Sequence, residues 1–156
     1  MHLLIAGIPA SGKSTFARWL VDDHGYVRCP SGEEPGATFL DEIDGARAEH
    51  PNVVIDWGFP VGALSIVRGL IASGVEAWWF DGDRDAALEA FLARSGHPGT
   101  KHDWDVQMTA IQGHWTEIEE LFQGRILNVV TPGPAHLSNE SHFRLIQGTD
   151  PQEIDP

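Results

Sequence analysis

Residues 7–15 read Gly7-Ile8-Pro9-Ala10-Ser11-Gly12-Lys13-Ser14-Thr15, and this stretch decides the fold. It fits G-x-x-x-x-G-K-[ST], the pattern of a phosphate-binding P-loop. The apolar run Leu3-Leu4-Ile5-Ala6 precedes it and predicts a buried strand, and a helical pattern that ends at Gly25 follows it. A strand, a glycine-rich loop and a helix are the context in which this motif binds nucleotides. The stretch therefore predicts a nucleotide phosphate-binding site.

The residue types in this loop suit an anion. Gly7 and Gly12 can adopt backbone angles that other residues avoid, so that successive amides point toward a phosphate. The N-terminus of the following helix adds a partial positive charge. Lys13 is expected to reach the β- and γ-phosphates, and the Ser14 hydroxyl is expected to bind Mg²⁺. The residues expected to bind the cofactor are Gly7, Pro9, Ala10, Ser11, Gly12, Lys13, Ser14 and Thr15.

The overall composition is that of one globular domain. The chain has 156 residues, 42% of them apolar, which is enough for a substantial core. It contains no apolar run near the ~20 residues that a membrane span needs, and it does not begin with a basic region followed by a long apolar one. We therefore expect neither a signal peptide nor a membrane partner. Cys29 is the single cysteine, which excludes an internal disulfide and fits a cytoplasmic location.

The charge balance bears on the substrate. The chain has 23 acidic and 10 basic residues, a formal net charge of −13. Such a surface repels a phosphodiester backbone at long range and disfavours DNA or RNA as the substrate. The acidic excess also serves solubility.

The remaining chain alternates between strand and helix patterns. Further strands are predicted at 26–29, 53–59, 75–80 and 126–130, and further helices at 38–50, 61–73, 84–95, 104–123 and 141–146. The helix at 104–123 is inferred from an apolar stripe that is typical of a buried face, formed by Trp104, Met108, Ile111, Trp115, Ile118 and Phe122. Alternation predicts an α/β fold, a three-layer α/β/α sandwich with a five-stranded parallel sheet and helices on both faces. We expect a domain at residues 1–147 and a loose tail at 148–156.

Polar residues follow several of the predicted strands. Asp56, Asp81 and Thr131 each stand at or just after the end of a strand, as the P-loop does. Parallel strands place their carboxyl ends on one edge of the sheet, where ligands bind. The sequence therefore predicts that these residues converge on one site.

With these motifs the chain resembles the small P-loop kinases of the nucleoside-monophosphate-kinase-like group. The resemblance covers residues 1–135 and points to the branch with polynucleotide 5′-kinase domains, zeta toxins and chloramphenicol phosphotransferase. Three features support it: the N-terminal P-loop, the stretch Val53-Val54-Ile55-Asp56-Trp57-Gly58-Phe59, and Arg94 with Lys101 before a long helix. Two features of the branch are missing, an acidic-basic pair at 31–34 and an arginine shortly after residue 59.

The resemblance implies a P-loop NTPase fold that uses Mg-ATP. It implies a lid at about 95–103, from which Arg94 contacts the transferred phosphoryl group and Lys101 is a weaker candidate. It also implies that the loop at Thr131 holds the adenine. ATP is favoured over GTP because the chain has no Asn-Lys-x-Asp element.

Several residues have more than one interpretation. Asp56 is a candidate for a water-mediated Mg²⁺ contact, for the base that accepts the acceptor's proton, or for a helix N-cap. Asp41 and Asp44 share a helix face and are alternative bases, or are simply solvated. Arg94 is a catalytic cation or an exposed residue at a helix end. Trp57 stacks on a planar substrate or packs in the core.

Three functions follow from this sequence. The first is an ATP-dependent kinase that phosphorylates a hydroxyl or phosphate of a small metabolite or nucleotide-like acceptor, with Lys13, Asp56 and Arg94 as catalytic residues and Ser14 and Asp56 at the metal. The second is a nucleotide-binding or slow NTPase module that regulates a partner. The third is a polynucleotide 5′-hydroxyl kinase, which the net charge disfavours.

Overall fold

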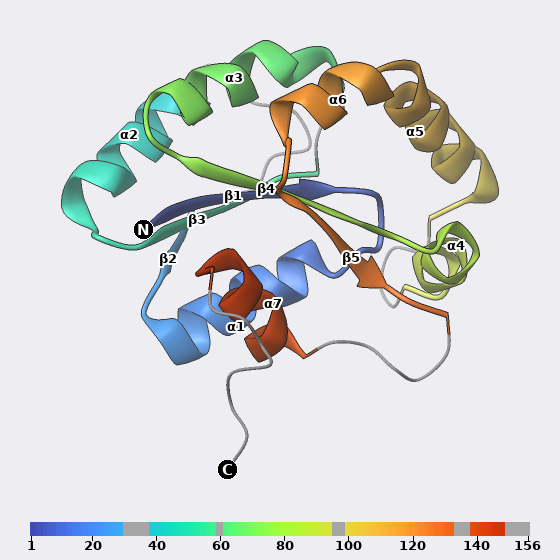
Figure 1. The fold of residues 1–156 in the computed structure, drawn as a ribbon, viewed down its shortest axis with the longest axis horizontal. Helices are drawn as coiled ribbons and strands as arrows, with labels where there is room; N and C mark the ends of the chain where they lie inside the picture. Colours follow the sequence, from blue (N-terminus) through green and yellow to red (C-terminus); the bar gives the residue numbers. More distant parts are fainter. Residues whose placement is uncertain (30–37, 59–60, 95–98, 133–137, 149–156) are drawn as a thin grey trace.

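The computed structural model of the chain describes residues 1–29, 38–58, 61–94, 99–132 and 138–148. These residues form a five-stranded sheet with the order β2-β3-β1-β4-β5, in which all neighbouring strands are parallel. The strands are β1 (His2–Gly7), β2 (Val27–Cys29), β3 (Val53–Asp56), β4 (Glu76–Gly82) and β5 (Ile126–Val130). Helices cover both faces of this sheet (Figure 1), which confirms the predicted α/β/α sandwich.

The two faces of the sheet carry separate hydrophobic cores. One face is covered by four helices (Figure 1): α2 (Phe39–Glu49), α3 (Leu64–Ala72), α5 (Lys101–Gly113) and α6 (Trp115–Leu121). Helices α1 (Lys13–His24) and α7 (Asn139–Ile146) lie over the other, and α4 (Arg84–Leu92) lies beyond the carboxyl ends of the strands. Successive side chains of a strand point to opposite faces, so Leu4 enters the first core and Leu3 the second. The central strand β1 is consequently apolar throughout.

The predicted single helix at 104–123 is wrong in one respect. The structure has two helices there, α5 and α6, separated at His114, whose φ of −114° is outside the helical range. Gly113 precedes this break, and glycine is a weak helix former. The break redirects the chain so that Trp115 packs edge-on against Trp79, with ring centroids 6.3 Å apart. The apolar stripe nevertheless faces the core, as predicted.

Helix α5 also begins earlier than predicted, because its first turn has a capping box. The Thr100 hydroxyl accepts a hydrogen bond from the Asp103 amide at 3.1 Å, and the Asp103 carboxylate accepts one from the Thr100 amide at 2.9 Å. Residues 101–103, predicted as part of a lid loop, are therefore the first turn of a helix. Residues 95–98 of that predicted lid lie outside the described residues.

The other element ends differ from prediction by a few residues. Helix α4 ends at Leu92, three residues before its predicted end, and α7 begins two residues before its predicted start. The 3₁₀ turn η1 (Val61–Ala63) leads into α3. Residues 149–156 of the predicted tail lie outside the described residues. No helix in the described ranges is long and apolar enough to cross a membrane.

Candidate functional site

The P-loop connects the carboxyl end of β1 to α1 through a turn with unusual backbone angles. Gly7 has φ 144° and lies so close to β4 that a Cβ atom there would be 2.2 Å from the Phe80 carbonyl oxygen. The next amide, that of Ile8, donates to the same Phe80 oxygen at 3.0 Å. Gly12 has φ 82°, and Ala10 has φ 58°, which is uncommon for a residue with a side chain. The neighbouring strand therefore fixes the loop in a conformation that only glycine permits at Gly7.

Lys13 is held inside this turn. Its side chain is buried, and its ammonium group donates to the carbonyls of Ile8 at 2.7 Å and Gly7 at 3.2 Å and to the Ser11 hydroxyl at 3.3 Å. Burial lowers the pKa of Lys13 from 10.5 to about 8, while Asp56 acts to raise it and Arg94 to lower it. The charges of Asp56 and of Arg94, the other two predicted catalytic residues, thus each act on Lys13.

Asp56 ends strand β3 beside the P-loop strand, where it faces Ile5 in the parallel register. Its side chain is 3% exposed and forms an ion pair with the guanidinium of Arg28, which is 33% exposed on β2. Sequence analysis did not identify Arg28 as a site residue. The available signal was its place on β2, because an edge strand next to β3 can bring a basic side chain to a buried carboxylate.

Two of the alternatives for residues 56 and 57 are excluded. Asp56 is not the N-cap of α3, because Ala63 occupies that position and no side chain caps it. Trp57 does not face a substrate, since it is fully buried and its ring lies 5.2 Å from that of Phe39, between centroids. The tryptophan is a core residue.

Asp81, at the end of β4, serves the local structure. Its carboxylate accepts a hydrogen bond from the Gly82 amide at 2.8 Å and forms an ion pair with Arg84. The next acidic residue, Asp83, is the N-cap of α4 and accepts from the Ala86 amide at 2.8 Å. These contacts fix the start of α4 against the sheet edge.

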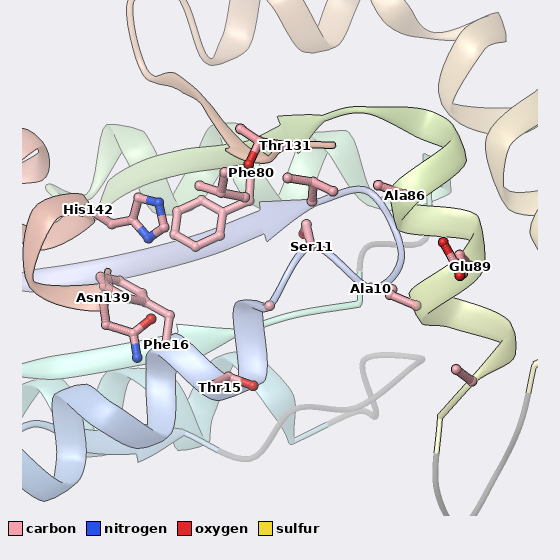
Figure 2. Close-up of a pocket in the computed structure, with 15 residues that line it drawn as sticks. Ala10, Ser11, Thr15, Phe16, Phe80, Ala86, Glu89, Thr131, Asn139 and His142 are labelled. Atoms are coloured by element: carbon pink, nitrogen blue, oxygen red, sulfur yellow. The ribbon is translucent and has the colours of Figure 1, made fainter. Parts of the chain in front are cut away.

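A cavity of about 620 Å³ opens next to the P-loop. Figure 2 shows the P-loop residue Ser11 between α4, with Ala86 and Glu89, and α7, with Asn139 and His142. Thr131, predicted to lie near the adenine, lines the same cavity. The other lining residues come from the P-loop, α1, α4 and strands β4 and β5: Ala10, Gly12, Thr15, Phe16, Phe80, Ala90, Ala93, Val129 and Val130.

Helix α4 presents small side chains to this cavity. Ala86, Ala90 and Ala93 recur at intervals of four and three residues, so they lie on one face of the helix or its end. A face without long side chains lets a ligand approach the helix closely. These alanines were not predicted as site residues from the sequence.

Arg94 follows the end of α4 and is exposed, with its guanidinium carbon 5.1 Å from the centre of the Phe91 ring. Its positive charge acts to lower the pKa of Lys13. Lys101 forms an ion pair with Asp105 on the exposed surface of α5, which weakens its case as a phosphate ligand.

The remaining candidates are solvent-exposed. Asp41 and Asp44 lie on the outer face of α2, where Asp44 pairs with Arg47 at 3.4 Å. The solvated-face interpretation therefore describes both aspartates, and neither is brought to the P-loop by any contact in the described residues.

The donors available to a metal are few. Ser14, in the first turn of α1, is exposed, so its hydroxyl is open to a ligand. Within the described part of the chain, no cluster of three His, Cys, Asp or Glu side chains could hold a metal ion. A hydroxyl and a carboxylate suit Mg²⁺, which commonly takes only one or two protein oxygens together with substrate phosphates. The donor set fits a metal that arrives with the nucleotide.

Comparisons with known proteins support the fold. The sequence matches no known protein-family description and no curated protein sequence. Two solved structures are similar to this one over nearly the whole chain. A gluconokinase from Sinorhizobium meliloti 1021 has a TM-score of 0.55 and 14% sequence identity, with 94% of this chain and 89% of that chain covered. A deoxyadenosine kinase from M. mycoides with bound dATP has a TM-score of 0.57 and 11% identity, with 95% and 98% covered. Because these identities are low, the likeness establishes the fold alone.

Proposed function

We propose that the protein is an ATP-dependent phosphotransferase that moves the γ-phosphoryl group of Mg-ATP to a hydroxyl or phosphate of a small metabolite or nucleotide-like acceptor. The observation that supports it most is the placement of Lys13. A buried ammonium inside a glycine-rich turn, next to a cavity of about 620 Å³, suits a ligand with a polyphosphate and a larger organic part. The gluconokinase and the deoxyadenosine kinase compared above are both kinases by name, which agrees with this proposal.

The P-loop would bind the phosphates through backbone amides and Lys13. In phosphoryl transfer, catalysis depends mainly on positioning and on neutralising the charge of the transferred group. Mg²⁺ would supply part of that neutralisation, with the Ser14 hydroxyl as its ligand from this chain. Binding a phosphate would give the Lys13 ammonium an anionic partner in place of the neutral loop carbonyls that it now contacts.

The reaction forms one bond and breaks one. The acceptor oxygen forms a bond to the γ-phosphorus, the bond between that phosphorus and the β–γ bridging oxygen breaks, and ADP leaves. A hydroxyl acceptor loses its proton to a base, for which Asp56 is the candidate at this edge of the sheet. Arg94 would stabilise the negative charge on the transferred group.

The acceptor would bind on the β2–β3 side of the P-loop. Arg28 and Asp56 lie there as an ion pair, opposite the cavity on the α4–α7 side. A carboxylate that already accepts from an arginine can also accept from a hydroxyl, since each oxygen has two lone pairs. The same guanidinium could contact an anionic group of the acceptor.

The test is ADP release from Mg-ATP with a panel of acceptors: sugar acids, nucleosides, nucleoside monophosphates and a 5′-hydroxyl oligonucleotide. We expect one of the small-molecule classes to stimulate release, with a phosphorylated product in the mass spectrum and no activity in Lys13→Met. Equal ADP release by the wild type and Lys13→Met with every acceptor would contradict the proposal. Transfer to the oligonucleotide alone would identify a polynucleotide 5′-kinase.

A nucleotide-binding module that hydrolyses ATP slowly is the second candidate. The ion pair between Asp56 and Arg28 favours it, because the carboxylate is already engaged. This candidate predicts ADP release that is independent of every acceptor, and no phosphorylated small product.

A further inference from the structure

His142, on α7, has a buried ring nitrogen without a partner. The residue is 6% exposed, and its Nε2 atom makes no hydrogen bond to any of the residues that the structure describes. A buried polar atom without a partner costs about 1–3 kcal/mol, so such atoms normally have one. A bound ligand would supply the missing partner.

The ring of His142 belongs to an aromatic wall of the cavity. Its centroid lies 5.8 Å from that of Phe80 and 6.4 Å from that of Phe16. Figure 2 shows His142 beside Phe80 at one end of the cavity, with Ser11 of the P-loop between this end and Glu89 on α4. The planes of the three rings are inclined to one another by 51° to 74°, and together they form a mostly apolar surface next to the loop that would bind phosphates.

The chemistry of this wall suits a heteroaromatic base better than a phosphate. Burial lowers the pKa of His142, so the ring is neutral at pH 7 and has one N–H donor and one nitrogen acceptor. A neutral ring nitrogen beside aromatic rings can exchange one hydrogen bond with a nucleobase, while an anion would find no charge there.

We propose that His142 recognises the nucleobase of the bound nucleoside triphosphate through a hydrogen bond at Nε2, with Phe16 and Phe80 forming the apolar wall beside that base. This inference rests on the proposed function, because it takes the P-loop as the site of the phosphates. It adds a specificity-determining residue from α7, which lies more than 120 residues after the P-loop in the sequence.

The first test uses the wild-type protein and needs no substitution. With ¹⁵N-labelled histidine, the Nε2 resonance of His142 is followed during titration with Mg-ATP and, separately, with magnesium tripolyphosphate. We expect ATP to shift this resonance and tripolyphosphate, which has no base, to leave it nearly unchanged. Identical shifts with both ligands, or no shift with ATP, would overturn the inference.

The second test measures affinity. His142→Phe keeps an aromatic ring in the wall but removes both nitrogens, and we expect it to weaken ATP binding about fivefold, the value of one neutral hydrogen bond. Binding of tripolyphosphate should stay within about twofold. His142→Gln, whose amide can replace Nε2, should recover part of the loss. The matched control is His114→Phe, at the exposed junction of α5 and α6.

The outcomes separate this inference from the proposed function. If the wild type binds neither ATP nor tripolyphosphate, the proposed function fails and the role of His142 fails with it. If both bind and His142→Phe leaves the affinity for ATP unchanged, only the role of His142 is wrong, and an internal water is the partner of Nε2. If His142→Phe weakens both ligands equally, the residue is structural.

Discussion

The guanidinium of Arg28 on β2 forms an ion pair with the carboxylate of Asp56 at the end of β3. The two residues are 28 positions apart in the sequence, and the parallel pairing of Cys29 with Ile55 brings them together. The pair places one positive and one negative charge beside the P-loop, on the side away from the large cavity. The pair links β2, whose Arg28 would contact the acceptor, to β3, which carries the candidate base Asp56.

Arg28→Met should destabilise the fold more than an ordinary surface change. The Asp56 side chain is 3% exposed, so the substitution would leave a buried carboxylate without its cation. We expect a loss of about 2–3 kcal/mol in the free energy of unfolding, measured by urea denaturation. The double variant Arg28→Met/Asp56→Asn should lose about 1–2 kcal/mol less than the sum of the two single variants.

The control is Arg68→Met, which removes the exposed ion pair with Glu117 at 3.2 Å. Exposed pairs contribute little, so this variant should lose less than about 0.5 kcal/mol. Equal losses for Arg28→Met and Arg68→Met would show that the Arg28–Asp56 pair is not buried as described.

The buried Lys13 predicts a specific pH dependence of stability. Its pKa is about 8 in the folded protein and 10.5 when unperturbed, so the unfolded chain binds the proton more tightly between these values. The free energy of unfolding should therefore rise with pH across this window. Between pH 7 and pH 10, the free energy of unfolding of the wild type should rise by about 2 kcal/mol relative to that of Lys13→Met. Both proteins are denatured at each pH, so that the contributions of the other titrating groups to the difference in stability cancel. A difference in the free energy of unfolding that does not change with pH would contradict the prediction.

Gly7 and Gly12 should respond differently to alanine. At Gly7 the new Cβ would lie 2.2 Å from the Phe80 carbonyl oxygen, so the backbone would have to move. We expect a loss of about 3 kcal/mol or more in the free energy of unfolding. At Gly12 no atom lies within 4 Å, and the cost is the positive φ of 82°, about 1 kcal/mol. Thermal denaturation of the two variants measures this. A Gly12→Ala protein less stable than Gly7→Ala would contradict the described loop.

Arg94→Ala should reduce turnover more than nucleotide binding. Its exposed guanidinium lies over the Phe91 ring and acts on Lys13 only through its charge, so its contribution would come from the transferred phosphoryl group. With an active acceptor, we expect kcat to fall about 10²–10³-fold and the affinity for ATP to change less than about threefold. Arg125→Ala, at an exposed arginine before β5, is the control. Unchanged kcat would assign Arg94 to the solvated surface.

The fold was predictable because its signals are local. The P-loop motif, the apolar strands and the glycines that end helices can each be recognised from a few neighbouring residues. The parallel direction of the strands follows from the alternation of strands and helices along the chain. Gly25 ends α1 with φ 66°, as its position suggested. The division between α5 and α6 was not predictable from periodicity, because the apolar stripe continues through His114 while the backbone turns.

The candidate site was predictable only in part. The P-loop, Asp56 and Thr131 follow strands, so the topology places them at one edge of the sheet. Arg28 and His142 depend on contacts between distant segments, and neither has a sequence motif. Their positions become clear only when β2 is paired with β3 and α7 is packed against α1.

The central claim is that the P-loop binds the triphosphate of ATP, and isothermal titration calorimetry of Mg-ATP into the protein at pH 7 tests it most directly. We predict saturable binding of one nucleotide per chain, with an affinity reduced at least about tenfold in Lys13→Met. The absence of saturable binding to the folded wild-type protein, or identical binding by the two proteins, would contradict it.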